Sequence, residues 1–176
     1  KGNGVKSRAR KLSAIKGLYK FLFSKEKSIT ENPAKDIDAP SVKQALPKFL
    51  SEAESRKLLQ AAREFGEKNQ KRDYAILSLF LNCGMRVSEL CGISISDLSS
   101  DFSQVIVTGK GNKQRLIYLN DSCQKALLAY MEERKTIPCR DETALFVSRN
   151  QRRLSVKTVQ WLVYKYLDLA GLGDKG

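Results

Sequence analysis

The chain has 176 residues, with 32 Lys and Arg against 19 Asp and Glu, and its formal net charge is +13. It contains no histidine, which excludes a Ser-His or Cys-His nucleophile pair, a histidine metal ligand and an imidazole acid or base within these residues. A hydrophobic fraction of 41% with 29% charged residues is typical of a globular chain, and the longest near-apolar run, Tyr74 to Leu81, is too short to cross a membrane.

Four cysteines, Cys83, Cys91, Cys123 and Cys139, are spaced too irregularly for a structural zinc site. No C-x-x-C pair occurs, although finger-type zinc sites are built on such pairs. We therefore expect reduced thiols that serve as packing residues in a cytoplasmic protein, with no metal and no other cofactor.

The positive charge is concentrated near the N-terminus. Residues 1–30 hold nine basic groups and one acid, which is +8 of the total of +13. On a helix the apolar residues of this segment would fall in one arc, and the basic residues would form a second arc on the opposite side. Small residues within the basic arc would let the helix backbone approach a phosphate chain. This pattern favours nucleic acid as partner over a solvated lysine-rich face, and a membrane-surface helix ranks third. The basic arc comprises Lys6, Arg10, Ser13, Lys16 and Lys20.

Arg8 and Lys11 lie outside the basic arc, so we expect this helix to begin near Ser7. Residues 32–48 then carry three of the four prolines and are expected to form an extended linker, because each proline disfavours helix in the residue before it.

After the linker the pattern predicts a mainly helical domain with one hairpin. The first helix has Ser51 as its N-cap in a capping box with Glu54 and turns Leu58, Leu59, Ala62 and Phe65 toward the core. The next expected elements are a buried helix over 72–83 that stops at Gly84, a short helix over 87–91, and strands over 104–108 and 115–119. A helix over 121–135 and an extended segment over 143–147 follow. The last helix is expected to run from the N-cap Ser155 to about residue 170, before Gly171, with Tyr164 and Tyr166 as packing residues.

Arg86 follows the end of a buried helix and precedes the next helix. Packed backbone on both sides could present its guanidinium to an oxyanion with little loss of entropy, and Glu89 could orient it. The alternative is an ordinary surface ion pair.

The expected hairpin turn, 109–115, carries glycines on both sides of Lys110 and two further cations, Lys113 and Arg115. Such a turn can approach a bulky anionic ligand closely. The alternative is a solvated hairpin whose lysines serve solubility.

Together, Gly84-Met-Arg-Val-Ser-Glu-Leu-Cys-Gly92 and Val107-Thr-Gly-Lys-Gly-Asn-Lys-Gln-Arg115 resemble the tyrosine recombinase (integrase) family, most closely its Xer-like and transposon-integrase members. The resemblance covers nearly the whole chain. It implies a mainly α fold with a small antiparallel β-sheet (α+β). Residues 1–40 would be the C-terminal part of a helical core-binding domain that clamps DNA, 41–48 a linker, and 49–176 the N-terminal part of the catalytic domain.

By the same resemblance, Arg86 stabilises the scissile phosphate and Lys110 protonates the departing 5′-oxygen, with Glu89 in support and Lys113 as the fallback acid. An ammonium suits this role because it offers both a proton and a charge. The residues expected to face DNA in this domain are Lys113, Arg115, Arg152, Arg153, Lys157, Thr158 and Gln160, the last as a candidate for base edges.

The implied activity is cutting and rejoining of duplex DNA at a recombination site through a 3′-phosphotyrosyl intermediate, by four protomers on two sites. The family's His-x-x-Arg motif is missing, and none of the six tyrosines matches its nucleophile. We therefore expect an internal fragment of a longer recombinase that cannot cleave a strand by itself. The alternatives are a non-catalytic duplex-DNA-binding regulator or architectural protein on the same scaffold, and an RNA-binding helical protein.

Overall fold

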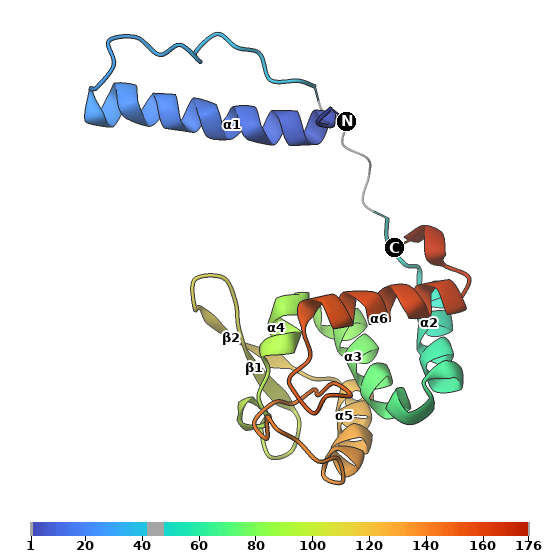
Figure 1. The fold of residues 1–176 in the computed structure, drawn as a ribbon. Coiled ribbons are helices and arrows are strands. Elements are labelled where there is room, and N and C mark those ends of the chain that lie inside the picture. The colour runs from blue at the N-terminus through green and yellow to red at the C-terminus, as the bar shows by residue number, and fades with distance from the viewer. Residues whose placement is uncertain (1, 42–47, 176) are drawn as a thin grey trace. The chain divides into compact units, whose positions relative to one another are not determined.

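The chain falls into two compact units, Lys1–Pro47 and Lys48–Gly176 (Figure 1). The computed structural model describes residues 2–41 and 48–175. Of residues 32–48, which were expected to form an extended linker, residues 42–47 lie outside the described part of the chain, residues 33–36 form a turn, and residues 37–41 are neither helix nor strand. The domain boundaries stay a prediction. Within the described ranges no helix combines the length and the apolar character that a membrane crossing requires.

The first unit is built on one long helix, α1 (Val5–Phe21), which continues into a π-helical turn, η1 (Leu22–Glu26). The expected start near Ser7 was wrong: Gly4 is the extended N-cap residue, and its carbonyl accepts from the N–H of Arg8 at 3.0 Å. The helix thus includes two further residues, Val5 and Lys6, and Gly4 takes the extended N-cap conformation without a side-chain cap. No residue of α1 is buried.

The second unit is mainly helical with a two-stranded antiparallel sheet, which confirms the predicted fold class. The sheet is a hairpin in which Gln104 pairs with Tyr118 and Thr108 with Gln114. The elements in chain order are α2 (Glu52–Phe65), η2 (Glu67–Asn69), α3 (Gln70–Cys83), α4 (Val87–Gly92), η3 (Ile95–Asp97), β1 (Gln104–Thr108), β2 (Gln114–Tyr118), α5 (Asp121–Arg134), α6 (Val156–Leu169) and η4 (Gly173–Lys175).

Helix ends follow their predicted signals. The Ser51 hydroxyl accepts from the N–H of Glu54 at 3.2 Å, and the Glu54 carboxylate accepts from the N–H of Ser51 at 2.7 Å, so the capping box is confirmed. Gly84 ends α3 with φ +56°, a left-handed conformation in which a side chain would be strained.

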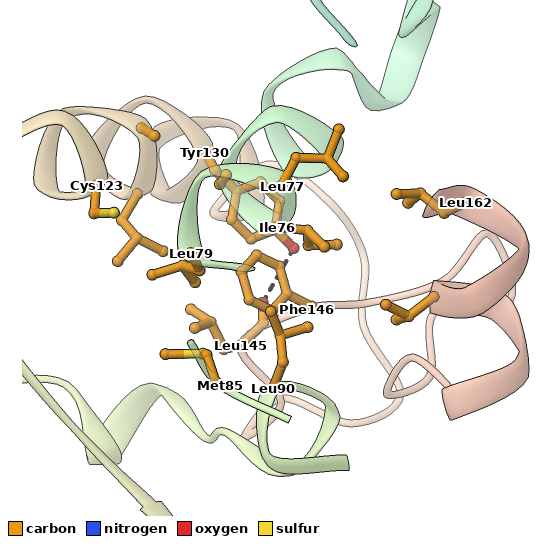
Figure 2. Close-up of a cluster of buried hydrophobic side chains, with 14 of the residues drawn as sticks. Ile76, Leu77, Leu79, Met85, Leu90, Cys123, Tyr130, Leu145, Phe146 and Leu162 are labelled. Atoms are coloured by element: carbon orange, nitrogen blue, oxygen red, sulfur yellow. Dashed lines mark hydrogen bonds between the residues drawn. The ribbon is translucent and has the colours of Figure 1, made fainter. Parts of the chain in front are cut away.

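The core is centred on α3, which packs against α2 and α5, while α6 packs against α2 and α4 (Figure 1). Figure 2 shows the stacked rings of Tyr130 and Phe146, whose centroids are 5.3 Å apart. The Tyr130 hydroxyl donates to the carbonyl of Leu145 at 3.0 Å, and burial raises the pKa of Tyr130 to about 12. This bond ties α5 to the segment that enters the core beside it.

That segment, residues 143–147, is not the continuous strand that its composition suggests. It makes two isolated bridges, Ser94 with Ala144 and Val147 with Arg153, and bends between them. Leu145 and Phe146 are both buried, and two successive residues cannot point to the same side of a regular strand.

Two predicted core positions were wrong. Tyr164 is 55% exposed and Phe65 is largely exposed, whereas Tyr166 is buried as predicted. Helix α6 buries the stripe Val159, Leu162 and Tyr166, and a 3.6-residue period leaves Tyr164 outside it.

Tyr166 completes a buried polar cluster. Its hydroxyl donates to Asp73 at 2.8 Å, and Arg72 donates to the other carboxylate oxygen at 2.8 Å. Burial raises the pKa of Asp73 above its ordinary value, although the Arg72 charge opposes this. The cluster joins the start of α3 to α6.

Replacing Tyr166 with Phe should leave the Asp73 carboxylate one donor short in a buried place. We expect the free energy of unfolding at pH 7 to fall by about 1–3 kcal/mol, measured in urea. The matched control Tyr164→Phe, on the exposed face of the same helix, should change it by less than ~0.5 kcal/mol. Equal values for the two variants would contradict the structural role of this cluster.

Candidate active site

Arg86 lies where α4 begins. It is the N-cap residue of α4, two residues after the left-handed Gly84, and Met85 between them is buried. The Arg86 side chain is nevertheless 70% exposed. The backbone is thus fixed on both sides while the guanidinium faces solvent, as the sequence pattern predicted.

Glu89 is the buried centre of the site, with a side chain only 1% exposed. Its two oxygens accept from the Arg86 N–H at 2.8 Å, from Arg86 Nη1 at 2.7 Å and from Arg115 Nη2 at 2.9 Å. The backbone N–H of Arg86 and the two guanidinium groups lower the pKa of Glu89 to about 2 in spite of its burial. An ordinary surface ion pair does not have this geometry, because one partner here is completely enclosed.

Arg115 reaches Glu89 from strand β2. The hairpin register pairs it with Val107, and it shares its face of the strand with the buried Ile117. Its side chain remains 46% exposed. Sequence reasoning placed Arg115 only at DNA and missed this contact, although the alternation Arg115, Ile117, Leu119 already marked the inward face.

The hairpin turn lies directly against this cluster at Gly109. A Cβ at Gly109 would lie in ordinary contact with Arg86 Nη1 at 3.7 Å but only 3.1 Å from Glu89 Oε1, so a larger residue would require the Glu89 carboxylate to shift by a few tenths of an ångström. The turn is closed by the Gly109 N–H, which donates to the Lys113 carbonyl at 2.8 Å. Lys110, the next residue, is exposed at the tip. The structure therefore brings Arg86, Glu89, Arg115 and the residue before Lys110 together.

Arg153 holds the opposite end of α4. Its Nη1 donates at 2.8 Å to the carbonyls of Gly92 and Ile93, and its Nη2 donates to Ser94 Oγ at 3.1 Å. Its Nε pairs with Asp141 at 3.2 Å. The last carbonyls of a helix have no partner within the helix, and Arg153 supplies one. Its role at DNA stays a prediction, whereas these contacts fix α4.

Arg152 lines a hollow of about 460 Å³ with two arginines that sequence reasoning missed, Arg140 and Arg149. The Ser148 N–H donates to the Arg152 carbonyl at 2.8 Å, and the Arg140 N–H donates to the Gln151 carbonyl at 2.8 Å, so the loop is closed on itself. The sequence signal that could have indicated this cluster was the presence of Arg140, Arg149 and Arg152 within thirteen residues.

The other predicted DNA-facing residues occupy two helices. At the start of α6, Lys157 and Gln160 are exposed, while Thr158 is half-buried with its hydroxyl 2.9 Å from that of the N-cap Ser155. On α1 every member of the basic arc is exposed except the half-buried Lys16. Lys113 is exposed in the hairpin turn.

Among residues 2–41 and 48–175, no group of three or more Cys, Asp or Glu side chains is arranged to hold a metal ion. The chemistry open to the cluster at α4 is that of fixed cations: binding an oxyanion and donating hydrogen bonds to it.

Comparison with known proteins shows to which family the chain belongs. Residues 48–175 match the phage integrase family. The tyrosine recombinase XerC of Caldanaerobacter subterraneus subsp. tengcongensis is 43% identical over 175 residues, which are 99% of this chain and 48% of that protein. The XerC of Thermodesulfovibrio yellowstonii is 36% identical over 180 residues, covering 99% of this chain and 59% of that protein. The chain thus spans about half the length of the curated relatives it matches.

Solved structures agree. The XerA recombinase crystal structure superposes with a TM-score of 0.65 and 27% identity, covering 92% of this chain and 62% of that one. The post-cleavage complex of XerH with palindromic difH has a TM-score of 0.76 at 20% identity, over 96% of this chain and 51% of that one, and shows the shared fold. The chain belongs to the phage integrase family of tyrosine recombinases.

Proposed function

We propose that this chain is part of a Xer-like recombinase that cuts and rejoins duplex DNA at a specific site through a 3′-phosphotyrosyl intermediate. The observation that carries the proposal is the exposed Arg86 guanidinium, fixed on the buried Glu89 beside the hairpin of Lys110. The XerC relatives, similar over nearly the whole chain, support it.

In this proposal Arg86 binds the non-bridging oxygens of the scissile phosphate. Glu89 holds one edge of the guanidinium, and the remaining N–H groups stay open to solvent in a fixed orientation. Charge accumulates on these oxygens as phosphorus becomes pentacovalent, so a preorganised cation stabilises the transition state more than the ground state.

Lys110 serves as the general acid for the departing 5′-oxygen. It is carried on a turn whose preceding residue, Gly109, lies against both Arg86 and Glu89. A proton donor at this place would neutralise the alkoxide as the bond to phosphorus breaks.

The remaining cations bind the DNA backbone. The basic arc of α1 forms one surface, and the Arg140, Arg149 and Arg152 hollow together with the start of α6 forms another. We further propose that four protomers assemble on two duplex sites and that the protein acts in the cytoplasm.

Because the chain spans about half of its relatives, strand cleavage is tested in the full-length protein on a nicked suicide substrate. Arg86→Ala should reduce covalent protein–DNA adduct formation by about 10²–10³-fold, the usual effect of losing one oxyanion donor. Lys110→Ala should also reduce it, and a substrate with a 5′-bridging sulfur, whose thiolate leaves without a proton, should restore the rate of Lys110→Ala but not that of Arg86→Ala.

Lys113→Ala is the matched comparison within the turn: its adduct formation should fall less than that of Lys110→Ala, through weaker DNA binding, and the sulfur substrate should not restore it. Rescue of Lys113→Ala by the sulfur substrate instead would move the acid role to Lys113. A wild-type protein that binds the duplex and forms no adduct would favour the non-catalytic regulator.

Glu89→Gln tests the positioning residue through its charge. The lowered pKa means that ionised Glu89 stabilises the fold above about pH 4.5, and that this contribution is lost as the pH falls toward 2. We expect Glu89→Gln to lower the free energy of unfolding by about 3 kcal/mol at pH 7, with the deficit shrinking below pH ~4. The exposed surface-pair control Glu132→Gln should change the free energy of unfolding far less than Glu89→Gln does, and a Glu89→Gln deficit that is constant with pH would refute the assignment.

The basic arc of α1 can be tested with two double variants of equal charge change. Lys16→Ala with Lys20→Ala removes two members of the arc, whereas Arg8→Ala with Lys11→Ala removes two cations outside it. In a salt titration of duplex binding, the first should make the slope of log K against log salt shallower by up to about 0.9 per lost phosphate contact, and the second should leave it unchanged. Equal changes would indicate a diffuse charge effect, and a preference for RNA over duplex DNA would favour the RNA-binding alternative.

A further inference from the structure

Two of the four cysteines lie side by side near the active site. Cys83 is the last residue of α3, and Cys123 lies in the first turn of α5. Their sulfur atoms are 4.0 Å apart, and both thiols are free. Cys83 is half-buried and Cys123 is almost fully enclosed, so a small reagent reaches the pair from the Cys83 side.

The pair is held by a short polar network. The Asn120 side chain accepts from the Cys123 N–H at 3.0 Å and donates to Asn82 at 2.9 Å, which ties the start of α5 to the end of α3. The Cys123 thiol also lies 3.5 Å from the carbonyl of Ser78. Because the two backbones are already fixed, bringing the sulfurs together costs little conformational entropy.

The two thiols differ in reactivity. A hydrogen bond from the Cys123 thiol and the charge of Arg115 lower the pKa of Cys83, although burial opposes this. The bond to Cys83, together with burial, raises the pKa of Cys123. Cys83 is therefore the nucleophile, and Cys123 keeps its proton until a partner sulfur becomes electrophilic.

We propose that Cys83 and Cys123 form a peroxide-sensitive dithiol that closes reversibly into an intramolecular disulfide. The Cys83 thiolate attacks one oxygen of hydrogen peroxide, the O–O bond breaks, and the product is a Cys83 sulfenic acid and water. Cys123 then attacks this sulfur, loses its proton and expels a second water. Two thiols and one peroxide thus give one disulfide and two waters.

The disulfide would act on the site because Cys83 is three residues from Arg86. An S–S bond of about 2.05 Å requires the sulfurs to approach by roughly 2 Å. Cys123 is the more enclosed of the two sulfurs, so we expect Cys83, at the end of α3 and joined to Arg86 by Gly84 and Met85, to make most of this movement. This coupling rests on the proposed function, whereas the disulfide itself does not.

Peptide mapping tests the disulfide directly. The 176-residue chain is treated with a small molar excess of hydrogen peroxide, alkylated and digested with trypsin. We expect peptide 73–86 linked to peptide 116–125, two hydrogens lighter than the free pair and separated again by dithiothreitol. The peptides that carry Cys91 and Cys139 should be alkylated. A sample without the 73–86/116–125 link, or with Cys83 oxidised straight to sulfinic acid, overturns the proposal.

Variants separate the roles of the two sulfurs. Cys123→Ser should leave a sulfenic acid at Cys83 that dimedone traps, and Cys83→Ser should give neither product. Cys139→Ser is the matched control and should form the link normally. Trapping of Cys123 rather than Cys83 in the single variants would overturn the assignment of the nucleophile.

The effect of the disulfide on the active site is measured separately, as formation of the covalent protein–DNA adduct by the oxidised full-length protein. We expect a loss of about tenfold or more, since a misplacement near 1 Å at a reacting centre can cost ~10²-fold, and recovery with dithiothreitol. Linked peptides with undiminished adduct formation would overturn the coupling alone. Absence of any adduct from the reduced protein would instead overturn the proposed function and leave the disulfide standing.

Discussion

The geometry of the site depends on one buried carboxylate. Glu89 is enclosed, and an enclosed carboxylate is unfavourable unless hydrogen bonds and opposite charge compensate for its lost hydration. The compensation comes from two elements: the backbone and side chain of Arg86 at the start of α4, and Arg115 on β2. Satisfying Glu89 therefore fixes the hairpin to α4, and the position of Lys110 follows from that attachment.

Helix α4 could not form this platform unaided. It has six residues, too few for a stable helix in water, so its position must come from tertiary contacts. Glu89 and Arg86 close its N-terminal end, and Arg153 satisfies the carbonyls of Gly92 and Ile93 at its C-terminal end. An ion pair at one end and guanidinium–carbonyl hydrogen bonds at the other thus hold a short helix in place, and the exposed edge of Arg86 stays open to a ligand.

Local signals in the sequence predicted most of the fold. They failed where a side chain contacts a residue that is distant in the sequence. The capping box at Ser51, the stop at Gly84 and the hairpin depend on residues within a few positions, and the structure confirms them. Arg115 and Arg153 were both expected at DNA, yet each contacts a group far away in sequence. The bend at 145–146 likewise lies within a fully buried run, 144–147, which local patterning does not distinguish from a buried strand.

Arg115 also explains how a carboxylate can lie beside the proposed phosphate site. Glu89 and Arg86 alone would form a neutral pair, and the carboxylate would repel the same phosphate that Arg86 attracts. With Arg115 as a second cation on the other oxygen of Glu89, the cluster carries a net charge of +1 before Lys110 is counted. Both guanidinium groups keep an exposed surface while the carboxylate keeps none, so an approaching anion meets only positive charge. The buried acid thus orients Arg86 without cancelling its attraction for a phosphate.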